Sequence, residues 1–193
     1  MAAPPVLRDV FNAYRHLHGE EHDGMVFSDE HGPLQRLDVL VYRPTPATDL
    51  TTFRTIGMAA AAMPSAPGPG DGGRAELQLR RRGQLTRADE GAIAVRLANL
   101  AVHPFATGTQ LNWGHMIGLG EDFPAFPGCR AVFLAGPLSA DGLDYVDTGE
   151  GPVRIINVVP ITDAEREHGR TLPPVEFAQW LLDRTDVFAG RQR

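Results

Sequence analysis

The chain has 193 residues, a net charge of −6 and a single cysteine, Cys129. This length suits one domain spanning residues 1–193, with a core large enough to need no disulfide or structural metal. All 18 basic residues are arginine, and the absence of lysine excludes a Walker A loop and a Schiff-base lysine.

The same figures limit the partners and the location. A negative net charge argues against nucleic acid as a partner. No apolar run approaches the roughly 20 residues of a membrane span, and residues 1–5 do not resemble a signal peptide. We therefore expect a cytoplasmic protein without a membrane partner.

The N-terminal third of the sequence predicts one helix followed by three strands. Apolar residues recur at helical spacing from Val6 to Leu17, and Gly19 is a natural helix stop. Short apolar and β-branched runs then predict strands at residues 25–27, 37–42 and 51–58, with Gly57 marking a bulge.

Residues 59–73 form a tract rich in Ala, Pro and Gly. We interpret it as a flexible surface loop between two strands, because such a composition has little tendency to form regular structure. Residues 75–79 then alternate apolar and polar side chains, which predicts a half-buried strand. Thr86 and Asp89 predict the capped start of a helix that ends before Pro104.

The most apolar run of the chain lies in its C-terminal half. Residues 153–159 are mostly β-branched, which is typical of a strand buried on both faces. Pro160 is expected to end the hydrogen-bond ladder of this strand. Thr162 and Glu165 then form the capping-box pattern of a helix start. A buried strand that turns directly into a capped helix predicts a mixed α/β domain.

Shorter elements complete the C-terminal half. A final helix is predicted from Pro173, because proline favours the first turn of a helix. The remaining strands are predicted at residues 111–117, 131–134 and 143–146.

Residues 18–22, His-Gly-Glu-Glu-His, match the H-x-x-E-H pattern of one class of zinc proteases. That chemistry needs both imidazoles on one face of a helix, with the glutamate activating water. Here Gly19 interrupts the pattern and no apolar periodicity continues beyond it, so we interpret the segment as a solvated, charged loop. A metal-dependent hydrolase that uses His18, Glu21 and His22, with His16 as a further ligand, remains the alternative.

The other reactive side chains lack the partners that catalysis needs. His103 and His115 have no carboxylate at a fixed spacing, and Cys129 has no visible base to activate its thiol. We expect structural roles for the histidines, a small buried side chain at Cys129, and a solvated strand end for the arginines at 80–82. The sequence therefore predicts no catalytic residue, no cofactor and no metal site.

Acidic residues crowd the segment from 141 to 150, at a spacing that does not match a calcium-binding loop. One interpretation is the solvated tip of a hairpin. The functional alternative is an acidic rim that binds a basic protein partner, formed by Asp141, Asp144, Asp147 and Glu150.

Six segments occur in an order that resembles the suppressor of fused family. They are residues 38–45 (DVLVYRPT), 52–58 (TFRTIGM), 75–79 (AELQL), 97–101 (LANLA), 108–113 (GTQLNW) and 155–165 (IINVVPITDAE). The likeness covers about residues 35–185. Each segment is only moderately specific, but the shared order is hard to obtain by chance.

The resemblance implies an α+β fold, in which helices pack on a mixed, mostly antiparallel sheet, without known catalytic residues. In eukaryotic relatives this domain is the N-terminal half of a two-domain adaptor that sequesters a transcription factor, and the second half has no counterpart in this sequence. Bacterial single-domain members resemble immunity proteins that neutralise toxins of polymorphic toxin systems. We therefore expect a non-enzymatic domain that binds a toxin directly. The alternatives are a regulatory adaptor that sequesters another protein, and the hydrolase described above.

Overall fold

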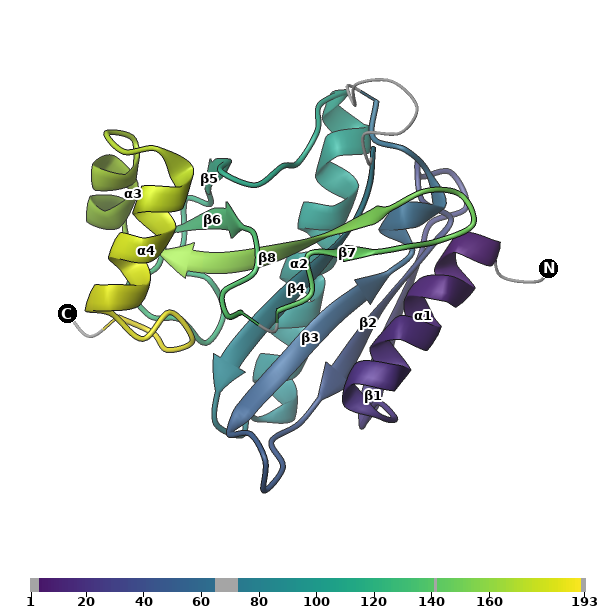
Figure 1. Ribbon diagram of the computed structural model, residues 1–193, viewed down its shortest axis with the longest axis horizontal. Helices are drawn as coiled ribbons and strands as arrows, with labels where there is room; N and C mark the ends of the chain where they lie inside the picture. The colour runs from purple at the N-terminus through teal and green to yellow at the C-terminus, as the bar shows by residue number, and fades with distance from the viewer. Residues whose placement is uncertain (1–3, 65–72, 141, 192–193) are drawn as a thin grey trace.

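The computed structural model describes residues 4–64, 73–140 and 142–191. Figure 1 shows a twisted sheet with helices on both of its faces. The helices are α1 (Pro5–His18), α2 (Arg87–Thr107), α3 (Asp163–Gly169) and α4 (Pro174–Arg184), and a 3-10 turn, η1, spans Met58–Ala60. The strands are β1 (Asp23–Ser28), β2 (Arg36–Tyr42), β3 (Leu50–Ile56), β4 (Arg74–Arg82), β5 (Met116–Gly118), β6 (Ala131–Ala135), β7 (Tyr145–Val146) and β8 (Val153–Ile161).

The strands pair in the order β1-β2-β3-β4-β8-β6-β5. The short β7 pairs with Val153 and Arg154, ahead of the residues of β8 that pair with β6. Within the described part of the chain, β4 and β8 form the one parallel pair, and every other neighbouring pair is antiparallel. The predicted α+β fold with a mixed, mostly antiparallel sheet is confirmed.

One face of the sheet packs against α2. Ile93, Leu97 and Ala101 of this helix lie in the same buried cluster as the strand residues that point toward it. These strand residues include Val39, Val41, Phe53, Leu77, Leu79, Ile156 and Val158. Because β4 and β8 contribute to this face at the centre of the sheet, α2 covers the middle of the molecule.

The opposite face is covered in two places by the two ends of the chain (Figure 1). α1 packs through Val6, Val10 and Tyr14 onto β2 and the start of β8. α4 packs through Phe177 and Leu181 onto β6 and the end of β8. Polar residues of β3, β4 and β8 occupy the sheet between these two apolar clusters.

Most predicted helix ends are present. Gly19 follows α1 in a left-handed conformation with φ 75°, which favours glycine. Thr86 accepts a hydrogen bond from the N–H of Asp89 at the start of α2. Thr162 and Glu165 form the complete capping box of α3, with hydrogen bonds of 3.1 and 2.8 Å. β8 is buried along its whole length, as predicted for the apolar run.

β8 does not end at Pro160, contrary to the prediction, and continues to Ile161. Pro160 lies opposite Val132 of β6, but its carbonyl accepts a hydrogen bond from Arg191 at 3.4 Å. The nitrogen and the carbonyl of one strand residue project to the same side, so the nitrogen of Pro160 also points away from β6. The missing N–H therefore costs the ladder no hydrogen bond.

α2 likewise continues past Pro104, where the prediction ended it. Proline removes one helical hydrogen bond, but only the last turn of α2 follows Pro104. The backbone N–H groups of Gly108 and Thr109 donate to the carbonyl of Pro104. Gly108 adopts φ 67°, so a left-handed glycine closes the helix after the proline.

The predicted strands at 51–58, 75–79 and 111–117 differ from the structure in extent or burial. β3 ends at Ile56, because Gly57 turns the chain with φ 137° into η1. β4 was predicted to be half-buried, but it is buried on both faces, since even Glu76 on its polar face is 0% exposed. The third strand is restricted to β5, because a turn at residues 112–115 precedes it.

The two ends of the tract predicted as a flexible loop lie within the described residues. Ala59 is buried within η1, and the N–H of Met63 donates to the carbonyl of Gly73 at 2.6 Å. Residues 65–72 of the predicted loop lie outside the described residues.

Candidate functional site

The predicted acidic residues flank the short hairpin of β7 and β8. Asp144 and Asp147 are exposed on either side of β7, and Glu150 is exposed in the turn before β8. Asp144 accepts a hydrogen bond of 2.7 Å from the next backbone N–H, and Glu150 pairs with Arg74 at 2.9 Å. Asp141 lies outside the described residues. Asp144, Asp147 and Glu150, which we call the acidic rim, thus present carboxylates to solvent along one hairpin.

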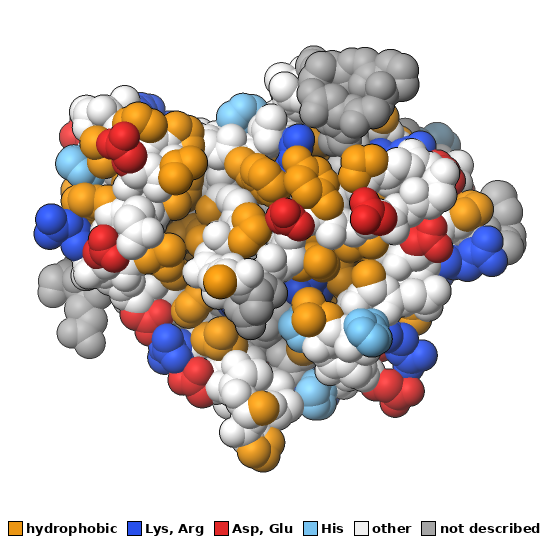
Figure 2. Space-filling model, viewed as in Figure 1, with side chains coloured by type: hydrophobic (Ala, Val, Ile, Leu, Met, Phe, Trp, Pro, Cys, Tyr) orange, Lys and Arg blue, Asp and Glu red, His pale blue; other side chains and the backbone are white. Residues whose placement is uncertain are grey.

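The end of α1 separates the histidines of the zinc-protease pattern. The ring of His18 packs on Tyr42, with 4.9 Å between ring centroids, whereas Nδ1 of His22 accepts from the backbone N–H of Arg43. Burial, helped by the positive charge of Arg54, lowers the pKa of His18 to about 4. Figure 2 shows histidine side chains near this end of α1. No group of three or more His, Cys, Asp and Glu side chains among the described residues is placed to hold a metal ion.

The remaining single residues lie on the surface or in the core. His103 and His115 are exposed, on α2 and in the turn before β5. Cys129 is fully buried, and burial raises the pKa of its thiol. A buried thiol with a raised pKa is a poor nucleophile, which agrees with its predicted role as a small core side chain.

The arginines at the end of β4 are not a solvated strand end, as the sequence had suggested. The guanidinium groups of Arg80 and Arg82 lie 4.7 and 6.0 Å from the ring centroid of Phe188. Arg81 donates to the carbonyl of Ala125 at 2.9 Å. These contacts hold the C-terminal segment against the sheet, so the arginines have a structural role that depends on residues far along the chain.

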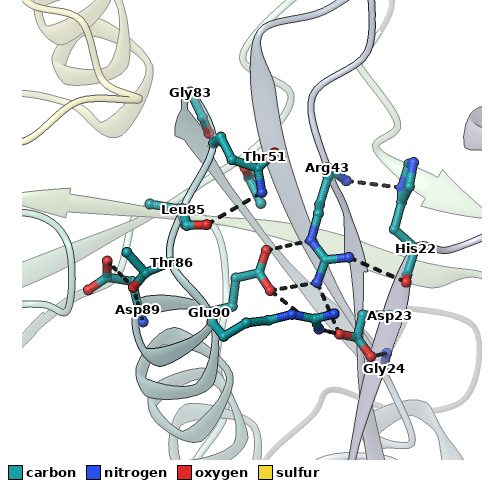
Figure 3. Close-up of polar contacts among 12 residues, drawn as sticks. His22, Asp23, Gly24, Arg43, Thr51, Gly83, Leu85, Thr86, Asp89 and Glu90 are labelled. Atoms are coloured by element: carbon teal, nitrogen blue, oxygen red, sulfur yellow. Dashed lines mark hydrogen bonds and ion pairs between the residues drawn. The ribbon is translucent and has the colours of Figure 1, made fainter.

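A buried carboxylate joins α2 to the edge of the sheet (Figure 3). Glu90 is 0% exposed and accepts two hydrogen bonds from Arg43, at 2.8 and 2.7 Å. Arg43 also pairs with Asp23 of β1 at 3.0 Å, and Arg87 of α2 pairs with the same aspartate. This network fixes the first turn of α2 over β1 and β2, and its charges are used in holding the fold together.

A second polar group lies between the sheet and α1. Arg54 of β3 is 2% exposed and sits opposite Leu40 of β2 and Gln78 of β4. Its guanidinium carbon is 4.4 Å from the ring centroid of Tyr14. Gln78 continues the polar row by donating to Asn157 of β8 at 2.6 Å. The centre of this face is therefore polar although it is buried.

Glu76 lies on the same face and organises the chain after β3. Its carboxylate accepts hydrogen bonds from the hydroxyl of Thr55 and from the N–H groups of Gly57 and Ala59, at 2.6, 2.8 and 3.0 Å. Burial raises the pKa of Glu76 to about 6, and these hydrogen bonds oppose the rise. The side chain of Glu76 therefore holds the backbone of the turn at η1 in place through hydrogen bonds.

Sequence reasoning missed Arg54, Glu76 and Glu90. The alternation in β4 was taken as a buried and a solvated face, but the second face is also buried, with Glu76 bonded to the backbone at η1 and Gln78 to Asn157 of β8. The available signal was the position of Arg54 within the otherwise uncharged run at residues 50–58. A single charge in such a run indicates a buried charge when both faces of the strand are covered.

Comparison with known proteins decides the family. The family model described as suppressor of fused protein (SUFU) matches residues 33–183. The chain belongs to the suppressor of fused family. The resemblance of the six sequence segments is thereby confirmed. No curated protein sequence matches the chain significantly.

Solved structures of the suppressor of fused family share the fold. The Sufu–Fu complex structure matches with a TM-score of 0.70, over 96% of this chain and 86% of that chain. Drosophila Suppressor of Fused matches with 0.69, over 95% and 48%, so the chain spans about half of that protein. A putative SUFU homolog from Neisseria gonorrhoeae matches with 0.69, over 96% and 94%. Each is 16% identical to this chain, so these matches establish the fold alone.

The described helices show no membrane-spanning candidate, because none of them is both long and apolar enough to cross a bilayer.

Proposed function

We propose that this suppressor of fused domain is a cytoplasmic bacterial immunity protein that binds a toxin of a polymorphic toxin system and blocks its active site. The observation that carries the proposal is the acidic rim, a row of exposed carboxylates on a hairpin fixed by β7 and β8. A toxin that acts on nucleic acid needs a basic surface to bind it, and opposite charge across an interface speeds association and fixes orientation.

The hairpin supports this role because its backbone is well held while its charges face outward. Tyr145 and Val146 pair with Arg154 and Val153 of β8, and Val146 is buried at 5% exposure. Asp147 forms no ion pair with a described residue. Glu150 is paired with Arg74, so Asp144 and Asp147 supply the free charge of the rim, and a hairpin held by β8 loses little conformational entropy when a basic surface binds.

The exposed edge of β1 supports a second contact in the same complex. Among the described residues, β1 pairs with β2 on one side only, and Val26 on its outward face is 60% exposed. An edge strand offers unpaired backbone groups to a partner strand. A toxin that adds a strand there gains main-chain hydrogen bonds beside any charge contacts.

Co-expression with the product of an adjacent toxin-like gene tests the proposal. We expect the wild-type chain to restore growth and to form a stable complex. The double variant Asp144→Asn, Asp147→Asn is expected to bind more slowly and with a weaker dependence on salt. The matched control is Glu30→Gln, Glu167→Gln, which removes the same charge from exposed positions elsewhere. Absence of rescue and of a complex with the wild type would refute the toxin as partner.

A regulatory adaptor is the second candidate, favoured by the structural match to a Sufu–Fu complex. In that case affinity purification from the native cell recovers a housekeeping protein with the chain, and no toxin. The same double variant distinguishes whether the acidic rim binds this partner.

A further inference from the structure

Arg54 is a buried cation with two unpaired guanidinium nitrogens. The residue is 2% exposed, and neither Nε nor Nη1 has a hydrogen-bond partner among the described residues. Arginine does not escape this situation by losing its proton, because a guanidinium stays charged in proteins. Buried charges in folded proteins are normally paired and hydrogen-bonded. The environment of Arg54 is therefore incomplete without an acceptor.

Two phenol hydroxyls border the same region. Tyr14 of α1 stacks on the guanidinium at 4.4 Å, and Tyr42 of β2 lies two residues along the strand from Leu40, the partner of Arg54. Both hydroxyls are buried and have no hydrogen-bond partner among residues 4–64, 73–140 and 142–191. The layer between α1 and the sheet thus holds the buried charge of Arg54 with two unpaired N–H groups, beside two phenol hydroxyls that can each donate or accept.

The nearest carboxylates of the chain do not supply what Arg54 lacks. Glu76 is engaged with the hydroxyl and backbone donors around η1. Glu21 lies at the outer end of the layer, where its Oε2 is 3.9 Å from Nε of Arg15. Neither forms an ion pair with Arg54. The positive charge is felt nearby, since it contributes to the lowered pKa of His18.

We propose that a small monovalent anion, chloride or a simple carboxylate such as formate, binds between Arg54, Tyr14 and Tyr42. Such an ion accepts hydrogen bonds from guanidinium N–H and phenol O–H groups and supplies the missing negative charge. Tyr14 belongs to α1, whereas Arg54 and Tyr42 belong to the sheet, so the ion ties the N-terminal helix to the sheet. The site is independent of the toxin binding proposed above.

The closed geometry selects a small ion. α1 leaves Arg54 only 2% exposed, so the side chain of a protein partner does not reach it unless the helix is displaced. Water satisfies hydrogen-bond donors but leaves the charge uncompensated. Gln78 lies next to Arg54 on the neighbouring strand, and its Oε1 is a buried acceptor without a described partner. A water molecule bound beside the ion could donate a hydrogen bond to it.

Chlorine NMR on the wild-type protein tests for the ion directly. Exchange of chloride into a protein site broadens the chloride resonance, and we expect broadening that formate reverses by competition. The thermal midpoint is expected to rise with the logarithm of chloride concentration, at an ionic strength kept constant with a bulky sulfonate. A chloride line width unchanged by the wild-type protein would show that the donors are hydrated only, and would overturn the proposal.

Variants locate the site. Arg54→Met keeps the length of the side chain and is expected to abolish both the broadening and the chloride-dependent rise. Arg36→Met removes an exposed arginine, paired with Asp38 at 2.8 Å, and is expected to respond as the wild type does. If Arg54→Met does not fold, Tyr14→Phe keeps the stacked ring, removes one donor, and is expected to weaken chloride binding several-fold. Equal responses in the wild type and in the variants at positions 54 and 14 would refute the site.

Discussion

At the scale of single residues, the most informative side chains are the polar ones that the fold buries. Glu76, Glu90 and Arg54 are each less than 3% exposed, and the charge of each is stabilised by a different kind of neighbour. Glu90 is paired with an arginine, Glu76 is surrounded by hydroxyl and backbone donors, and Arg54 stacks on an aromatic ring. The consequences for stability therefore differ from one residue to the next.

The first prediction concerns the pH dependence contributed by Glu76. Burial raises the pKa of its carboxyl from 4.5 to about 6, so the folded state holds a proton more tightly than the unfolded chain does. The contribution to stability is full below pH 4.5 and is lost as the pH rises through 6, by about 2 kcal/mol. Urea unfolding of the wild type and of Glu76→Gln between pH 4 and 7 measures it. The difference between the two proteins should change over that window, and a constant difference would contradict the prediction.

The second prediction concerns the ion pair of Arg43 and Glu90. Arg43→Met removes both hydrogen bonds to the buried carboxylate of Glu90 and leaves it only Arg87, at 3.9 Å, which is expected to cost about 3 kcal/mol of unfolding free energy. The double variant Arg43→Met, Glu90→Leu removes both charges and should recover much of that loss. Urea denaturation of the wild type, Arg43→Met, Glu90→Leu and the double variant gives the coupling free energy. Equal stability of the single and double variants would show that the buried carboxylate is not the source of the cost.

Single residues were also where the sequence was least predictive. The spacing of charges located Asp144, Asp147 and Glu150 at a hairpin, because solvated turns are local. It did not locate the partners of residues 80–82 or of Glu90, because those contacts join segments distant in sequence. Periodicity indicates that a strand has two faces, but it does not indicate whether a helix from elsewhere covers the second one.

At the scale of secondary-structure elements, the local signals for helix starts were reliable. Thr162 and Thr86 were predicted as caps from their side chains alone, and both accept the expected hydrogen bond. The two prolines were misread, because proline was assumed to end an element. At Pro160 the missing N–H would have no partner on β6, so the strand continues. At Pro104 the missing N–H lies close to the end of α2, so the helix loses little by containing it.

The third prediction tests the capping box of α3. Thr162→Ala removes the acceptor of the N–H of Glu165 and is expected to lower the unfolding free energy by about 1 kcal/mol. Thr162→Ser keeps the hydroxyl and should lie close to the wild type. Thermal unfolding followed by circular dichroism distinguishes the two. A loss of equal size in both variants would assign the effect to the methyl group, not to the cap.

At the scale of the whole molecule, the sheet order depends on contacts that no local pattern contains. The sequence predicted most of the strands, and the family resemblance predicted the mixed sheet. Neither the pairing of β4 with β8 nor the coverage of one face by both α1 and α4 follows from periodicity. These features arise because the apolar residues on each face of the sheet must be covered by a helix, and the lengths of the connecting segments determine which helix can reach them.

The fourth prediction tests the docking of the C-terminal segment. Val187 is 4% exposed in the cluster beneath α4, and Val187→Ala is expected to cost about 2 kcal/mol. Val175→Ala makes the same chemical change at a position that is 82% exposed, and should leave stability within about 0.5 kcal/mol. Chemical denaturation compares them. Similar losses would mean that the segment after α4 adds nothing to the core.

The parallel pairing of β4 with β8 also sets an order of events during synthesis. β4 ends at Arg82 and its neighbour begins at Val153, so the ribosome makes all of α2 and three strands before the central gap is filled. Until then the nascent chain exposes the unpaired edge of β4 at the centre of the sheet, and an unpaired strand edge promotes aggregation. A polypeptide arrested before Val153 should accordingly depend on chaperones and be cut quickly by proteases, whereas one released after Ile161 should resist them.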